Sequence, residues 1–174
     1  MAVWTCPECR REFGSVGQGH MCEPGLTTAQ FLAASPDFVA PVFERVRDHL
    51  VAVDRDQHDG AGDHQRSLIV DPLDGKVLFK NGPTFCVLEV KKKWVGVGFS
   101  LRRRLESGRL SRKVVDYGNK YFHVVNIDDA DQIDDEFEDW LTEAYFHGDE
   151  SSESVSGSDP MVPDDVDIVI APPP

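Results

Sequence analysis

Long apolar segments are missing from this sequence, and so are Lys and Arg side chains after residue 123. No stretch approaches the roughly 18 consecutive apolar residues that a transmembrane helix needs. The N-terminus also has no basic segment followed by an apolar run, which is the pattern of a secretory signal peptide. These absences predict a soluble, cytoplasmic protein that does not bind a membrane.

Signatures of catalysis are absent as well. There is no Ser–His–Asp or Cys–His arrangement of the kind used in covalent catalysis, and Cys86 lies in an apolar run, as a small buried hydrophobic residue does. Gly96-Val97-Gly98 falls inside a predicted strand, which is the wrong context for a phosphate-binding loop. His123 stands among apolar residues of another predicted strand and is interpreted as a half-buried histidine with its hydrogen bonds satisfied. A protein that binds rather than catalyses is therefore favoured.

Three of the four cysteines and one histidine lie within 17 residues near the N-terminus. They are Cys6, Cys9, His20 and Cys22. A Cys-x-x-Cys turn offers two thiolates to one tetrahedral ion, and a second pair of ligands completes the cage. Because four protein ligands leave no open coordination position, the pattern predicts a structural Zn²⁺ site. Reduced cysteines without a metal, or a disulfide, are the alternatives.

The second pair of ligands indicates how this module is built. His20 and Cys22 are two residues apart, so their side chains point the same way on an extended segment or tight turn. Zinc fingers that read DNA carry two histidines three to five residues apart on a helix, a pattern that this chain lacks. We predict a zinc-ribbon or knuckle-like module without a base-reading helix. Arg10 and Arg11 would offset the negative charge of three thiolates.

Charge divides the chain into unlike parts. The net charge of −13 comes from one end, because residues 124–174 contain 16 acidic side chains and neither Lys nor Arg. Residues 36–123 carry 16 basic and 12 acidic side chains. From His147 onward Gly, Ser, Pro and acids dominate, a composition that cannot bury enough apolar surface to order the chain. We predict a zinc-binding module at 1–26, a folded domain at 27–148 and a disordered acidic tail at 149–174.

The middle part has the pattern of an α+β domain. Thr27-Thr28 can cap a short helix through Leu32, and Ser35-Pro36 precedes about 15 residues of helical spacing, with Pro41 in the first turn. Short apolar segments separated by turn signals then predict a mostly antiparallel sheet of four to five strands. Asp128 or Asp129 would cap a closing helix whose apolar stripe runs from Ile133 to Tyr145. The expected strands are 67–71, 76–80, 84–90, 93–101 and 120–127, with a polar loop at 54–65 and a basic loop at 102–119.

Three of these segments, together with the N-terminal Cys/His pattern, resemble a family of prokaryotic zinc-finger proteins whose main domain is catalogued as domain of unknown function 5655. The segments are 93–103 (KWVGVGFSLRR), 121–125 (YFHVV) and 133–145 (IDDEFEDWLTEAY). The resemblance covers residues 1 to about 148 and implies a helix, a largely antiparallel sheet and a closing helix. It implies no established activity. The order of elements is also similar to small double-wing folds, some of which bind DNA, but fold alone does not give function.

A basic stretch gives the strongest indication of a ligand. Residues 91–113 contain nine basic side chains against one acid, Glu106. Cations beside an aromatic ring hold phosphates and stack on bases. If they flank one strand, they form two clusters roughly 30 Å apart. The candidate ligand-binding residues are Lys91, Lys92, Lys93, Trp94, Arg102, Arg103, Arg104, Arg109, Arg112 and Lys113. Solvated strand ends without a ligand are the alternative.

The acidic tail allows two interpretations besides solubilisation. Tethered to a basic patch, it can compete with polyanions through its effective concentration. It also contains a short β-prone run at 166–170 that can add a strand to the sheet of a partner protein. The chain would then be a protein-interaction adaptor.

An enzymatic hypothesis rests on a short motif. Asp71, Glu89 and Lys91 match the Asp…Glu-x-Lys pattern of divalent-metal nucleases, in which two carboxylates hold Mg²⁺. The pattern is common by chance. The His and Asp side chains at 56–64 are interpreted as a solvated loop. The leading hypothesis is a zinc-binding, non-enzymatic binding or regulatory protein for nucleic acid or another phosphate-bearing ligand.

Overall fold

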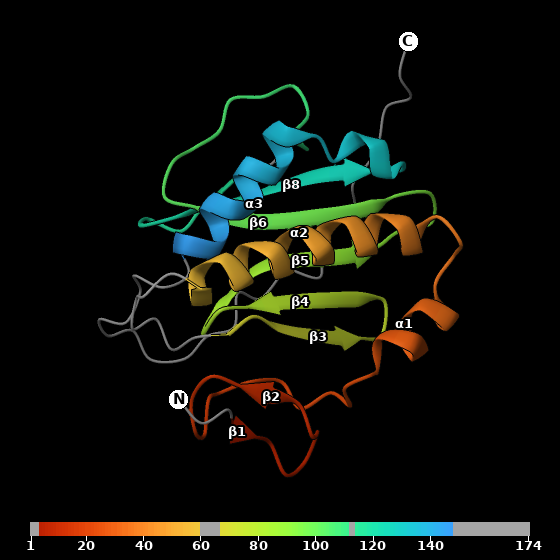
Figure 1. The fold of residues 1–174 in the computed structure, drawn as a ribbon, viewed down its shortest axis with the longest axis vertical. Helices are drawn as coiled ribbons and strands as arrows, with labels where there is room; N and C mark the ends of the chain where they lie inside the picture. Colours follow the sequence, from red (N-terminus) through yellow and green to blue (C-terminus); the bar gives the residue numbers. More distant parts are fainter. Residues whose placement is uncertain (1–3, 60–66, 112–113, 148–174) are drawn as a thin grey trace.

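The computed structural model describes residues 4–59, 67–111 and 114–147. They form the predicted α+β fold: one six-stranded antiparallel sheet, a separate two-stranded sheet, and helices that cover one face of the larger sheet (Figure 1). The strands are β1 (Trp4–Thr5), β2 (Glu12–Phe13), β3 (Ile69–Leu73), β4 (Lys76–Lys80), β5 (Thr84–Val90), β6 (Val95–Leu101), β7 (Val115–Asp116) and β8 (Tyr121–Ile127). The helices are α1 (Thr28–Ala34), α2 (Val39–Asp59), the 3₁₀ turn η1 (Ala130–Gln132) and α3 (Asp135–His147).

The large sheet has the order β3-β4-β5-β6-β8-β7, and every described pair of neighbours is antiparallel. Short turns connect β3 to β6 as a meander, which confirms the antiparallel prediction. The glycines of β6 allow a close approach on the face away from the helices. A Cβ on Gly98 would lie 2.3 Å from Cζ of Phe122, so the Phe122 ring occupies the space above this glycine.

The core lies between the sheet and the helices α2 and α3. Alternate residues of β6 point into it, and Val95, Val97, Phe99 and Leu101 are fully buried. The predicted stripe of α2 is buried from Val39 to Leu50. The stripe of α3 packs over β5 and β6 (Figure 1). Helical and strand periodicity thus identified the apolar core correctly.

Several boundaries differ from prediction. The helix α2 is longer than expected, at 21 residues, because it includes the first part of the predicted polar loop. Pro41 falls in its first turn, where its missing N–H is tolerated. Pro72 lies in β3, not in the turn, on the edge strand of the sheet where proline is accepted. Asp129 caps η1 rather than α3, and Asp134 accepts the backbone N–H of Phe137 at the start of α3. The extra strand β7 lies within the predicted basic loop.

The Cys/His module forms the two-stranded sheet β1–β2, which lies next to β3 at the edge of the large sheet (Figure 1). The helix α1, capped by Thr27 and Gln30 in a capping box, connects the module to α2. Within the described ranges, no helix has both the length and the apolar composition needed to cross a bilayer.

Candidate metal centre

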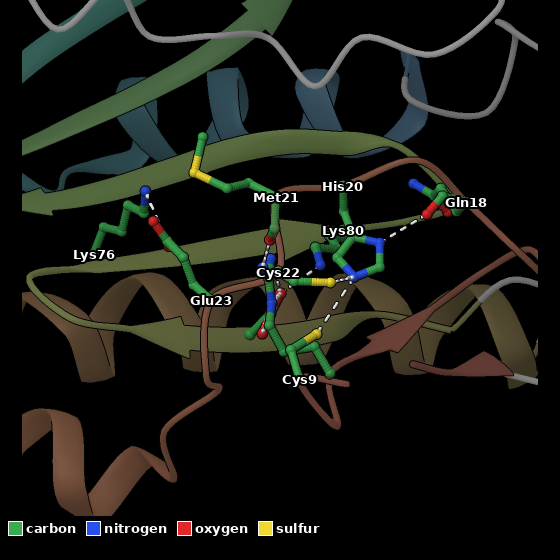
Figure 2. A network of polar contacts seen from close by, with 10 residues as sticks. Cys9, Gln18, His20, Met21, Cys22, Glu23, Lys76 and Lys80 are labelled. Atoms are coloured by element: carbon green, nitrogen blue, oxygen red, sulfur yellow. Dashed lines mark hydrogen bonds and ion pairs between the residues drawn. The ribbon is translucent and has the colours of Figure 1, made fainter. Parts of the chain in front are cut away.

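The four predicted ligands come together within the module. The Sγ atoms of Cys6, Cys9 and Cys22 and a ring nitrogen of His20 all lie within 4.8 Å of one another. The sulfurs of Cys6 and Cys22 are 3.8 Å apart. Nε2 of His20 is 3.4 Å from Cys9 Sγ and 3.3 Å from Cys22 Sγ (Figure 2). Residues from two separate segments therefore converge on one point.

These spacings fit a tetrahedral metal ion. Two sulfurs each about 2.3 Å from an ion lie about 3.8 Å apart at the tetrahedral angle, and a sulfur and an imidazole nitrogen lie about 3.5 Å apart. A disulfide would require about 2.05 Å between sulfurs. All four cysteines of the chain are free, so the disulfide alternative is excluded here. The donor set is compatible with a closed, structural metal site.

A tight turn between β1 and β2 positions the first two cysteines. The backbone N–H of Arg10 donates to the carbonyl of Cys6 at 2.8 Å, and the N–H of Cys6 donates to the carbonyl of Arg11 at 3.0 Å. Arg10 has a φ of 61°, in the left-handed region that glycine adopts more easily. The turn aims both thiols at the same point because the chain reverses within five residues.

The orientation of His20 is set by its second ring nitrogen. Nδ1 lies 2.7 Å from the carbonyl oxygen of Gln18, which can only accept, so Nδ1 carries the proton and Nε2 presents its lone pair to the cysteines (Figure 2). The ring packs against Phe13, with centroids 4.1 Å apart, and edge-on against Trp4. Both aromatic residues hold the imidazole in the geometry that a metal ligand needs.

The thiols differ in acidity because their surroundings differ. The backbone N–H of Cys9, followed by that of Glu8, lowers the pKa of Cys6 to about 6. Partial removal from water, with the neighbouring Cys6, raises the pKa of Cys22 to about 11. In the absence of a cation the cluster thus holds a proton on Cys22 while Cys6 ionises. A divalent ion would replace that proton and balance the remaining negative charge.

A buried ion cluster joins the module to the large sheet. Arg11 lies two residues after Cys9. Its Nε donates to Oδ1 of Asp71 at 3.1 Å and to Oδ2 at 2.9 Å, and its Nη2 lies 2.7 Å from the same Oδ2. Lys80 contacts the same carboxylate and lies over the Phe13 ring at 4.2 Å. The side chains of Arg11, Asp71 and Lys80 are only 3%, 5% and 2% exposed.

This docking cluster (Arg11, Asp71 and Lys80) was not predicted as a unit. The spacing along the chain does not reveal it, since Arg11 and Asp71 are 60 residues apart. A signal did exist: Asp71 is a charged residue inside an otherwise apolar strand, and such a residue must be paired. Arg11 was expected to offset thiolate charge, and it instead binds Asp71 and the Met21 carbonyl.

Comparison with known proteins assigns the sheet domain. Residues 68–147, from the start of β3 to the end of α3, match the family model described as a domain of unknown function, DUF5655. This segment is similar to that uncharacterised family. The predicted resemblance is thereby confirmed for the DUF5655 segment, whereas the match does not extend to the Cys/His module. No curated protein and no solved structure matches the chain.

The basic stretch is divided by the fold. Lys91, Lys92 and Lys93 lie in the turn before β6, and Arg102, Arg103 and Arg104 follow its other end. The two clusters are thus separated by the full length of a strand, about 23 Å for seven residues. Trp94 is half-buried, and its Nε1 is inside the protein without a hydrogen-bond partner among the described residues. Its ring is therefore not an open stacking surface.

Some of these cations already bind acids of α3 and its N-terminal turn. Arg103 forms a bidentate pair with Glu143, with contacts of 2.8–3.1 Å. Arg109 contacts Asp134 at 2.7 Å and Glu136 at 3.2 Å, and lies over the rings of Phe137 and Trp140. Lys91 pairs with Glu89 at 2.7 Å. Arg112 and Lys113 lie outside the described residues.

The nuclease pattern is not assembled in this structure. Asp71 is opposite Leu78, which is opposite Val87, so Glu89 lies two strands away and two residues further along. Strand spacing puts the two backbones about 12 Å apart, too far for carboxylates to share one ion. Asp71 is moreover engaged by Arg11 and Lys80. The hypothesis of a metal-dependent nuclease receives no support from this geometry.

The remaining sequence predictions fall into two groups. His123 was predicted to be half-buried with its hydrogen bonds satisfied, and this prediction is wrong in part. The residue is fully buried, its Nε2 accepts the backbone N–H of Leu105 at 3.0 Å, and its Nδ1 has no hydrogen-bond partner among the described residues. Cys86 is buried and burial raises the pKa of its thiol, as expected for an inert core residue. The acidic tail at 149–174, its run at 166–170 and the end of the polar loop lie outside the described residues, so the adaptor hypothesis stays a prediction.

Proposed function

We propose that Cys6, Cys9, His20 and Cys22 hold a structural zinc ion that fixes the module against the DUF5655 segment. The convergence of four donor atoms within 4.8 Å carries this proposal, because a closed set of three thiolates and one imidazole suits Zn²⁺ and leaves no position for a substrate. Zinc would supply the cross-link here. Gln18 and Phe13 orient the His20 ring, and Arg11 attaches the module to the large sheet through Asp71.

We further infer that the chain is a non-enzymatic binding protein for phosphate-bearing ligands. Support comes from those Lys and Arg side chains of the basic stretch that form no ion pair with an acid of the described residues. Lys92, Lys93 and Arg104 are exposed and make no ion pair with the described residues, and Arg102 is exposed beside them in sequence. Two positively charged sites therefore remain, one at each end of β6, and phosphates are the ligands that such cations bind most strongly.

The test is fluorescence anisotropy with labelled single- and double-stranded DNA and RNA at low and moderate salt. The zinc-loaded full chain is compared with Lys92→Glu/Lys93→Glu and with Arg102→Glu/Arg104→Glu. Affinity should fall steeply with salt and should fall further in at least one double variant. A variant ending at His147 should bind more tightly if the acidic tail competes for the same cations.

Two results would contradict the proposal. Absence of binding at low salt, by both the full chain and the shortened variant, would exclude nucleic acid as the ligand. Purified protein with no zinc, and with no uptake of zinc when it is added, would exclude the structural metal. The two results are independent, so each part of the proposed function stands or falls alone.

A further inference from the structure

The four cysteines of the chain differ in how far water can reach them. Cys6 and Cys9 are 3% and 7% exposed, whereas Cys22 is an exposed residue. Cys86 is fully buried in the core of the sheet domain. Metal binding keeps a cysteine in the thiolate form, and an oxidant from solvent reacts with the thiolates that it can reach. Cys22 is therefore the sulfur of this chain that a peroxide meets first.

A second cysteine lies within reach of Cys22. The Sγ atoms of Cys6 and Cys22 are 3.8 Å apart. A disulfide needs about 2.05 Å, so the two sulfurs would have to approach by only about 1.8 Å. Backbone hydrogen bonds of the turn between β1 and β2 hold Cys6. Cys22 lies within residues 18–27, which form neither helix nor strand, so a shift of Cys22 breaks no ladder of hydrogen bonds.

The segment that carries Cys22 also attaches the module to the large sheet. The carbonyl of Met21, one residue before Cys22, accepts a hydrogen bond from Nη1 of Arg11 at 3.0 Å. Glu23, one residue after Cys22, has its Oε2 3.5 Å from Nζ of Lys76 on β4 (Figure 2). A change in the position of Cys22 must therefore disturb contacts on both sides of it.

We propose that Cys22 is a site of reversible oxidation, at which a peroxide forms a Cys6–Cys22 disulfide, expels the zinc ion and loosens the module from the large sheet. The thiolate of Cys22 attacks one oxygen of the peroxide, the O–O bond breaks, and Cys22 becomes a sulfenic acid as hydroxide leaves. The thiolate of Cys6 then attacks this sulfur, and a second hydroxide leaves as the S–S bond forms. The two sulfurs lose two electrons, which the peroxide gains.

Loss of the ion follows from the number of ligands that are left. After the disulfide has formed, Cys9 and His20 are the remaining donors, and two donors are too few for a closed zinc site. The module has little apolar core to replace the ion, since its buried cluster consists of Cys6, Cys9 and Phe13 with Trp4 packed against it. Reduction of the disulfide by a thiol would restore both ligands. The inference rests on the proposed function, because it needs the zinc-loaded centre.

The test treats the zinc-loaded full chain with hydrogen peroxide while a chromogenic chelator measures the zinc released. About one ion per chain should leave. Tandem mass spectrometry of alkylated peptides should show the Cys6–Cys22 disulfide, and dithiothreitol with added zinc should reverse both changes. The N–H of Leu26 donates to the carbonyl of Pro72 on β3 at 2.8 Å, and its hydrogen exchange should become faster in the oxidised chain.

Two variants separate Cys22 from its neighbour. Cys22→His is the test variant, because an imidazole can hold zinc but cannot form a disulfide. It should release zinc on the order of 10-fold more slowly than wild type in peroxide. Met21→Leu is the matched control, because Met21 is 67% exposed and can itself be oxidised, and it should release zinc at the wild-type rate. If Cys22→His holds no zinc, the disulfide found in the wild-type chain decides.

The outcomes separate this inference from the proposed function. A Cys6–Cys9 disulfide, or zinc release that is slowed by Met21→Leu, would overturn the assignment to Cys22. A chain that holds zinc and keeps it in peroxide would overturn the redox response and leave the structural zinc site intact. A chain that contains no zinc and takes up none would overturn the zinc site, and this inference with it.

Discussion

Two segments with little regular structure are attached to the sheet domain by arginine–carboxylate contacts, and the surroundings of those contacts differ sharply. The Cys/His module is held through Arg11 and Asp71, whose side chains are 3% and 5% exposed. The segment between β6 and β7 is held through Arg103 and Glu143, which are 57% and 25% exposed. Both pairs are bidentate, so the chemistry is the same and burial is the variable.

Burial changes what such a contact does. An exposed pair contributes about 0–1 kcal/mol, because water solvates each partner nearly as well when they separate. A buried pair gives a modest net gain, yet removal of one partner leaves an uncompensated charge in a low-dielectric interior and costs about 3–5 kcal/mol. The docking cluster therefore specifies where the module sits, while the exposed pairs only bias the position of the basic segment.

The largest expected effect follows removal of the metal. Cys9→Ser takes away a buried ligand and should lower the zinc content from about one ion per chain to near zero, since three remaining ligands hold the ion poorly. The module should lose its ordered structure while the sheet domain keeps its own. Metal analysis and amide hydrogen exchange of residues 4–25 would measure both effects. Cys86→Ser is the control, and equal zinc loss in that variant would contradict the assignment.

The comparison of the two attachments is tested directly by a pair of variants. Asp71→Asn should reduce the free energy of unfolding by about 3–5 kcal/mol, because Arg11 and Lys80 stay buried without a counter-charge. Glu143→Gln should reduce it by less than about 1 kcal/mol. Urea unfolding of both zinc-loaded variants gives the two values. Similar losses in the two variants would show that burial is not what distinguishes these contacts.

The free energy of unfolding is expected to depend on pH through His123, the buried residue that accepts the backbone N–H of Leu105 in the basic segment. Desolvation lowers the pKa of His123 from its ordinary 6.5, so the folded protein keeps the ring neutral and able to accept the Leu105 N–H. The unfolded chain binds the proton more readily, and the free energy of unfolding must therefore fall as the pH drops below 6.5. Urea unfolding at pH 7.5 and 5.5 measures this. Since the thiols titrate in the same range, the decisive quantity is the difference between wild type and His123→Gln, which should shrink on acidification.

The smallest effect is expected at an exposed acid. Arg109 holds the pKa of Asp134 below its ordinary 3.8, with help from the backbone N–H of Phe137. The contribution of the ionised Asp134 to the free energy of unfolding is present above pH 3.8 and is lost as the pH falls through the lowered pKa. Thermal unfolding of wild type and Asp134→Asn should differ slightly at pH 5, and the difference should shrink as the pH falls below 3.8. A difference that does not shrink on acidification would mean that the carboxylate charge is not responsible.

Much of this architecture was predictable from local patterns. Strands β4 and β5 and the apolar stripe of α3 coincide with their predictions, because alternation and helical spacing record which face of an element is buried. The convergence of Cys6, Cys9, His20 and Cys22 was predictable for a different reason, namely that four residues within 17 positions of one another form a local feature. The boundaries of α2 and the six-strand count were missed, because capping and edge pairing depend on neighbours that are distant along the chain.

The sequence by itself determined the cluster of Cys6, Cys9, His20 and Cys22, the antiparallel α+β class and the concentration of negative charge at one end. The tertiary structure decided how the charges are paired. It buried Arg11 and Lys80 against Asp71, and it paired Arg103 and Arg109 with acids of α3 and its preceding turn. The physical reason is that the strength of a charge depends on its distance from other charges and from water, and the fold alone sets both distances.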